Sequence, residues 1–414
     1  MPQTRNETGS GPSFGRMTAT VVTAIFCRVV LNSARRFAYP FAPVLSRGLG
    51  VPLTAVTSLI AVNQATGVLG LFIGPLADRL GYRLMMMAAM ALLTAGMLAA
   101  GLFPVYWVVL AALLLAGLSK NIFDPAVQAF AGERIPFERR GMVIGILEFS
   151  WAGSTLVGVP LIGLLIDRFG WQSPFFALAF SGLIGLVVFG QVMGQTAGRP
   201  AVSRKKDSIR QAWRRLARRR TALGALVFGF LISAANDNLF VVYGAWLENA
   251  FGLGVVALGL GTGLIGAAEF LGEILTVSLA DRIGLKRSVI GGFGLVILSY
   301  LSLPLMSWHL TMALGGLFIV FLTFEYAMVS FLSLCKELAP EQRATMMATF
   351  FAAAGIGRVA GALIGGPVWL AGGIWATAFT SAGITILGLA ALGWGLHGWQ
   401  PLGVAPQLQD KSFE

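Results

Sequence analysis

The sequence predicts an all-α integral membrane protein with twelve transmembrane helices in two pseudo-symmetric halves of six. The first observation is composition, because 56% of residues are hydrophobic and 12% are charged, whereas soluble domains carry about 25% charged residues. The second is a series of apolar stretches of roughly 20 residues, which is the length that crosses a bilayer. The third is an internal duplication, which indicates two copies of one architecture.

The duplication repeats a motif and its surroundings. Leu76–Gly81 (LADRLG) returns as Leu279–Gly284 (LADRIG), about 203 residues later. The other repeated positions are about 204 residues apart: Asn32 and Asn236, Tyr39 and Tyr243, 48–51 and 252–255, Pro136 and Pro340, Arg139 and Arg343, Trp171 and Trp375, Phe175 and Phe379. The second copy is therefore one residue shorter than the first before the motif and one residue longer after it.

The apolar stretches place the predicted spans along the chain. Cys27 and Cys335 both fall in or near spans, so no disulfide framework is implied. The first 16 residues are polar, without a cleavable signal pattern. The predicted spans lie near 17–44, 53–76, 84–103, 106–131, 141–166, 173–194, 221–250, 255–280, 286–306, 308–335, 342–370 and 374–397.

Charge distribution predicts the orientation. The net charge is +12, which raises the possibility of nucleic acid, but the sequence has no groove-binding or stacking motif. With the N-terminus inside, most of the 30 Lys and Arg fall in cytoplasmic segments, as the positive-inside rule requires. We therefore expect an inner (plasma) membrane protein composed of a cytoplasmic tail 1–16, halves 17–195 and 221–397, a basic linker 196–220, and a cytoplasmic tail 398–414.

The basic linker has two interpretations. Ile209, Trp213 and Leu216 fall at helical spacing among its arginines, which suits a short helix on the anionic inner leaflet. An ordinary solvated linker explains the same charges, so both remain open.

The repeated motif carries a family resemblance. GPLADRLGYR at 74–83 and SLADRIGLKR at 278–287 fall between spans 2 and 3 and between spans 8 and 9. They resemble the cytoplasmic signature of the major facilitator superfamily, with Ser278 in place of the first Gly. The resemblance covers about 17–397 and implies a cytoplasmic gate, formed by Gly74, Asp78, Arg79, Gly81, Arg83, Asp281, Arg282 and Gly284.

The motif also has a local physical interpretation. Its glycines permit a tight turn, and its arginines can bond helix-end carbonyls. Its Asp residues can meet a helix N-terminus or a neighbouring Arg.

Within the superfamily, the sequence is most similar to the twelve-helix drug:proton antiporters and efflux permeases. Span 5 holds Gly153, Gly158, Pro160 and Gly163, similar to that branch's glycine-proline motif but with Val159 inserted. Span 4 lacks the branch's early Arg. Glycines in span 11 (Gly355, Gly357, Gly361, Gly365 and Gly366) are best explained by close helix packing.

Charges inside the spans are the candidate functional residues, because they are costly in a membrane and usually face a cavity or a partner. Lys120 and Asp124 are four residues apart, so we expect them to pair. The resemblance places helices 1, 4, 7 and 10 around a substrate cavity. The predicted cavity residues are Arg28, Lys120, Asp124, Asn236, Asp237, Glu325 and Arg358.

The two halves differ in the sign of these charges. Basic residues dominate the first half and acidic residues the second, so we expect the second half to carry protons and the first to hold something anionic. The coupling candidates are Asp237, Glu269, Glu325, Glu273 and Glu148. Paired structural groups are the alternative, and we expect Arg35 and Arg36 to snorkel at the end of span 1.

The sequence predicts no enzyme, cofactor or metal site. His309 and His397 are the only histidines, and no phosphate-binding loop motif appears. We expect a monomeric secondary transporter among membrane lipids, with proton-coupled export of a small amphipathic molecule. Transport of an organic anion or lipid-like molecule, and a non-transporting receptor or scaffold, are the alternatives.

Overall fold

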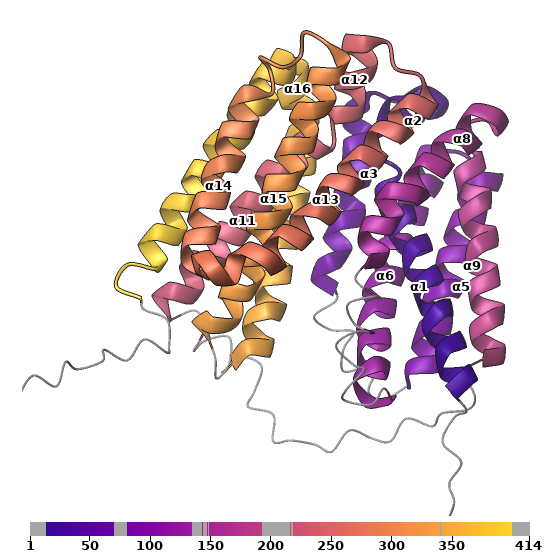
Figure 1. Cartoon of the computed structure of the whole chain (residues 1–414). Helices are drawn as coiled ribbons and strands as arrows, with labels where there is room; N and C mark the ends of the chain where they lie inside the picture. The colour runs from indigo at the N-terminus through magenta and orange to yellow at the C-terminus, as the bar shows by residue number, and fades with distance from the viewer. Residues whose placement is uncertain are drawn as a thin grey trace, which may run out of the picture. The chain divides into compact units, whose positions relative to one another are not determined.

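The computed structural model describes residues 14–69, 81–134, 149–192, 218–339 and 342–399, together with residues 143, 147 and 216. These residues form helices, and no strand occurs among them (Figure 1). The chain divides into two compact units: unit 1 is Met1–Ser203 with Leu247–Gly266, and unit 2 is Arg204–Trp246 with Ala267–Glu414. The boundaries of the two predicted halves and of the linker remain a prediction, since most of the linker lies outside the described residues.

Unit 1 is built on a group of long apolar helices. Helix α5 packs against α6 and α9, and α1 packs against α6, α9 and the short helix η2. Its elements are α1 (Phe14–Arg36), α2 (Ala42–Leu49), α3 (Leu53–Ala65), η1 (Thr66–Leu69), α5 (Tyr82–Leu102), α6 (Tyr106–Arg134), η2 (Ser154–Gly158), α8 (Val159–Phe169) and α9 (Ser173–Val192). The unit also takes parts of α12 (Tyr243–Phe251) and α13 (Val255–Ile283).

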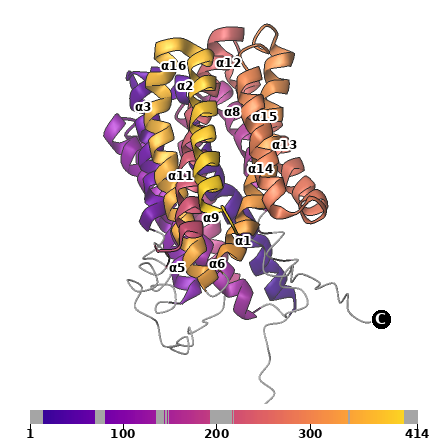
Figure 2. The ribbon, with the colours of Figure 1, turned by 90° about the vertical axis from the view of Figure 1, so that its left-hand side faces the viewer.

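Unit 2 centres on the pairing of α11 (Arg220–Phe240) with α16 (Arg343–Gly395), which Figure 2 shows. Helices α14 (Leu285–Ser302) and α15 (Leu310–Leu338) pack beside them. Helix α16 is 53 residues long, but Gly372 and Gly373 have non-helical dihedral angles and break it in two. It therefore contains both of the last two predicted spans.

The described residues hold nine helices long and apolar enough to cross a membrane, or ten when the bent pair α2 and α3 counts as one span. The stretch Thr345–Gly395 counts once among the nine, although its break separates two helices. An all-helical multi-pass membrane fold is thus confirmed, whereas the count of twelve stays a prediction.

Glycines of α16 let it approach α11 closely, as the sequence predicts. A Cβ on Gly357 would lie 2.1 Å from the carbonyl oxygen of Phe230, and one on Gly361 would lie 2.4 Å from that of Ala234. Small residues permit such contact between membrane helices. The packing interpretation is confirmed at these two positions, while a Cβ on Gly355 would meet nothing within 4 Å.

The repeated motif ends in the same backbone conformation in both copies. Gly81 has φ 83° and Gly284 has φ 90°, and each directly precedes a long helix. Side chains rarely adopt this left-handed region, so glycine is required there. The duplication seen in the sequence is therefore also present in the backbone.

Candidate functional site

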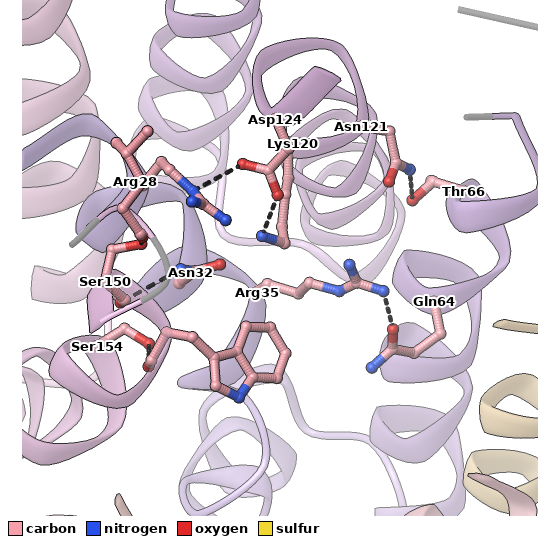
Figure 3. Close-up of polar contacts among 12 residues, drawn as sticks. Arg28, Asn32, Arg35, Gln64, Thr66, Lys120, Asn121, Asp124, Ser150 and Ser154 are labelled. Atoms are coloured by element: carbon pink, nitrogen blue, oxygen red, sulfur yellow. Dashed lines mark hydrogen bonds and ion pairs between the residues drawn. The ribbon is translucent and has the colours of Figure 1, made fainter. Parts of the chain in front are cut away.

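An ion-paired triad links α1 to α6 inside unit 1 (Figure 3). Arg28 Nε lies 3.2 Å from Asp124 Oδ1, and Lys120 Nζ lies 2.6 Å from Asp124 Oδ2. Arg28 and Lys120 are buried, with 3% and 7% of their surface exposed. The predicted pairing of Lys120 with Asp124 is confirmed, and Arg28 joins it from the neighbouring helix.

Arg35 and Arg36 do not snorkel, so that expectation was wrong. Arg36 is buried, donates a hydrogen bond to Thr155, and stacks over the Trp151 ring at 4.0 Å. Arg35 donates to the side-chain carbonyl of Gln64. These inward-facing partners stabilise both arginines within the helix bundle, which the local sequence at the end of α1 does not reveal.

Together these side chains form the unit-1 cluster, defined as Arg28, Arg35, Arg36, Lys120 and Asp124. Lys120 also lies 5.5 Å from the centre of the Trp151 ring. Among the residues that the structure describes, the cluster holds four cations against one carboxylate. Charges removed from water require compensation, to which Asp124, Gln64, Thr155 and the Trp151 ring contribute.

A one-residue insertion lies next to this cluster, in the segment that supplies Thr155 to Arg36. Gly158 lies against Ser33 and Gly361 lies against Asp237, and Ser33 and Asp237 are equivalent in the duplication. In the first copy, Gly153 and Gly158 are five residues apart. In the second copy, the matching glycines, Gly357 and Gly361, are four residues apart, so the first copy has one extra residue here. The π-helix η2 takes up the extra residue and carries Thr155, the acceptor for Arg36. Such π turns are frequent at functional sites.

Unit 2 holds a different polar group, where α11 crosses α16. Arg358 Nε lies 3.9 Å from Asp237 Oδ2, and the Asp237 side chain is 2% exposed. The neighbouring Asn238 donates to the carbonyl oxygen of Thr377 at 3.1 Å and to the Ser381 hydroxyl at 3.0 Å. Asn236 is half-buried on the same helix. The structure thus brings Asp237 and Arg358 together, which sequence spacing alone does not indicate.

The predicted coupling carboxylates of α13 and α15 lie on neighbouring helices within unit 2. A Cβ on Gly272 would lie 2.8 Å from the Glu325 Cβ, so the two helices touch there. Glu269 and Glu273 flank Gly272 on α13. Glu269 is buried, with 4% of its surface exposed, while Glu273 and Glu325 are half-buried. Glu148 lies outside the described residues.

The repeated motif is described only in part. Arg83 donates a hydrogen bond of 2.7 Å to the carbonyl oxygen of Gly190, near the end of α9, which is the helix-end contact that the sequence suggests. Gly74, Asp78 and Arg79 lie outside the described residues, and the Asp281 side chain is not described. Arg282 is exposed.

Sequence reasoning missed several polar partners of the unit-1 cluster, namely Tyr39, Gln64, Trp151 and Thr155. Gln64 also donates to the Tyr39 hydroxyl. The adjacent arginines Arg35 and Arg36 could have indicated these partners, because two charged side chains within a membrane span require polar groups around them. Across the described ranges, no group of three metal-ligating side chains occurs.

The fold and its buried charges define a multi-pass membrane protein of the transporter class. The sequence profile of the Major Facilitator Superfamily matches residues 24–362, and the chain belongs to this family. At 24% identity, 84% of the chain matches 87% of a protein named multi-drug resistance efflux pump PmrA homolog from Lactococcus lactis. At 26% identity, 64% of it matches 66% of multidrug resistance protein MdtG from Serratia proteamaculans.

A solved structure supports the fold. The crystal structure of a bacterial homolog of the human lysosomal transporter Spinster has a TM-score of 0.79 at 12% identity. The match covers 94% of this chain and all of that one. This likeness shows the fold alone.

Proposed function

We propose that the protein is a proton-coupled secondary transporter that exports a small amphipathic molecule by alternating access. The observation that carries the coupling is Glu269, a carboxylate buried in a membrane-length helix. Glu273 lies one turn further along that helix, and Glu325 lies on the helix that touches it. Relatives named as multidrug pumps support export.

The physical reason is the cost of charge in a medium of low dielectric constant. Two negative charges held close together there repel each other, so a proton held between neighbouring carboxylates lowers their electrostatic energy. Transport requires that this group change protonation between the two sides of the membrane. The substrate must also bind the two forms with different affinity.

Transport in proteoliposomes tests the proposal. Ligands from a thermal-shift screen would be radiolabelled and their flux measured with and without an imposed pH gradient. We expect Glu269→Gln or Glu325→Gln to abolish pH-driven flux while sparing substrate exchange. Glu248→Gln serves as the carboxylate control, because Glu248 pairs with Arg47 at 2.7 Å and is not among the coupling candidates.

The outcome assigns the residues. If Asp237→Asn alone abolishes pH-driven flux, the coupling group lies on α11. If Glu269, Glu325 and Asp237 variants all retain wild-type pH-driven flux, the assignment is wrong, and Glu273, Asp124 and Glu148 are tested next. Absence of any flux would favour a receptor or scaffold.

The positive-inside distribution supports a plasma-membrane protein with both termini cytoplasmic. Transport of an organic anion or lipid-like molecule is the second candidate. The observation that favours it comes from the sequence: the predicted spans of the first half hold four cations, Arg28, Arg35, Arg36 and Lys120, against the two acids Asp124 and Glu148.

A further inference from the structure

We propose that the start of α11 and the end of α16 form a binding site for an anionic phospholipid, with Arg220 and Trp394 holding its headgroup. We call these two residues the headgroup site. With the orientation that the sequence predicts, the site lies at the inner leaflet, whose surface is anionic. The site lies within unit 2, and the inference is independent of proton coupling.

The Arg220 guanidinium stacks on the indole of Trp394. Its central carbon lies 4.8 Å from the centre of the ring, which is within the range of a cation–π contact. Arg220 is exposed and Trp394 is 49% exposed. A guanidinium held flat on a ring keeps the N–H groups of its edge available, and these groups match two oxygens of a phosphate. The stacked pair is therefore suited to a phosphate-bearing headgroup.

Glycines hold the two helix ends together at this point. A Cβ on Gly224 would lie 2.7 Å from the Gly395 Cα, and a Cβ on Gly395 would lie 3.3 Å from the carbonyl oxygen of Arg220. Arg220 is the first residue of α11, and Trp394 is the last but one of α16. The helix crossing therefore sets the distance between the two backbones that carry the site.

Exposed apolar side chains continue from the headgroup site along both helices. Leu223 and Val227 follow Arg220 by three and seven residues, which is the spacing of one helix face, and each is 40% exposed. Leu387 precedes Trp394 by seven residues and is 62% exposed. The acyl chains of a bound phospholipid would pack along these side chains. This apolar surface favours a lipid over a soluble phosphate compound.

Further positive charge lies directly before α11. Arg218 is exposed and Arg219 is half-buried, so three consecutive arginines stand at the start of one helix. Arginines at the membrane surface attract anionic headgroups. Charge complementarity therefore selects an anionic phospholipid over a zwitterionic one.

The first copy of the duplication shows that the fold does not require the stacked pair. Arg16 stands at the position equivalent to Arg220, but Gly190 stands at the position equivalent to Trp394. The carbonyl oxygen of Gly190 instead accepts a hydrogen bond from Arg83. The indole at this helix end is thus a feature of the second copy, and a ligand site explains it where the shared fold does not.

Native mass spectrometry of the purified full-length protein tests the headgroup site, because it resolves each bound lipid. The probes are dioleoylphosphatidylglycerol and dioleoylphosphatidylcholine, which share their acyl chains and differ in headgroup charge. Glycerophosphoglycerol, the anionic headgroup without acyl chains, is the third probe. The variants are Arg220→Gln and Trp394→Leu. Arg287→Gln is the matched control, since it makes the same change at an exposed arginine of α14 that is also predicted to be cytoplasmic.

We expect the wild type and Arg287→Gln to bind the first phosphatidylglycerol at least about tenfold more tightly than phosphatidylcholine. Arg220→Gln and Trp394→Leu should each reduce that preference to less than about threefold. Glycerophosphoglycerol should bind far more weakly than the lipid. The proposal is overturned by equal preference in the wild type and Arg220→Gln, or by headgroup binding as tight as that of the lipid. An equal loss in Arg220→Gln and Arg287→Gln would also overturn it, because that result shows diffuse attraction to a basic surface.

A second comparison keeps the test decisive if Arg220→Gln does not fold. Trp394→Leu is then compared with Trp394→Phe, which keeps an aromatic face for the guanidinium. The headgroup site requires that the Leu variant lose the preference for phosphatidylglycerol and that the Phe variant keep it. Equal preference in these two variants would refute the site. Lipid binding is measured without flux, so the result does not depend on the proposed transport.

Discussion

Replacing Gly357 with alanine should destabilise the protein, whereas the same change at Gly355 should not. The two glycines lie two positions apart on the same helix, α16, and each variant makes the same chemical change. A Cβ at Gly357 would lie 2.1 Å from the carbonyl oxygen of Phe230 on α11. A Cβ at Gly355 would meet no atom within 4 Å.

The expected magnitude follows from these contacts. The obstructing atom at Gly357 belongs to the backbone, so no rotamer change relieves the clash and the helices must separate. Overpacking of this kind costs typically about 1–3 kcal/mol. Alanine is favoured over glycine within a helix by about 1 kcal/mol. We therefore expect Gly355→Ala to be neutral or stabilising. Because the helix preference applies to both variants, Gly357→Ala should be about 1–3 kcal/mol less stable than Gly355→Ala.

Thermal unfolding of both purified variants, followed by loss of the monodisperse peak, measures the difference. A midpoint of Gly357→Ala clearly below those of the wild type and Gly355→Ala supports the reasoning. Equal midpoints for the two variants would refute the close approach of α16 to α11 at Phe230.

The remaining predictions concern a buried amide, the repeated motif and the topology. Asn238→Ala should lower the free energy of unfolding by about 1–3 kcal/mol, because two buried acceptors on α16 lose their hydrogen-bond donor. An unchanged unfolding midpoint would contradict these hydrogen bonds. Asp78→Asn should raise cytoplasmic accessibility of the transport pathway while the protein still folds; unchanged labelling and unchanged flux would leave Asp78 with a role in the turn only. Single cysteines at Ser203 and Pro104 in a cysteine-free background should be protected and labelled, respectively, by an impermeant reagent on intact cells, and the reverse pattern would overturn the orientation.

The candidate site was predictable where partners are close in sequence. Lys120 and Asp124 are four residues apart, and helical periodicity alone places them together. Arg28 lies on another helix, so its approach to Asp124 depends on how α1 packs against α6. The burial of Arg36 likewise depends on Trp151 and Thr155, which no local pattern connects to it.

The sequence by itself determined the class and the duplication. Hydrophobic length and composition specify membrane-spanning helices, since each helix satisfies its backbone hydrogen bonds internally. The repeated motif specifies two copies, and the left-handed conformations of Gly81 and Gly284 follow from glycine in both. These are local properties, and local residues suffice to decide them.

The tertiary structure decided which charges meet. It joined Arg28 to the pair on α6, brought Arg358 to Asp237 across the crossing of α11 and α16, and turned Arg36 inward onto Trp151. It also accommodated the extra residue of the first copy in a π turn. Contacts between helices far apart in the chain are set by the packing of whole helix faces, and for that reason the pattern along any one helix does not determine them.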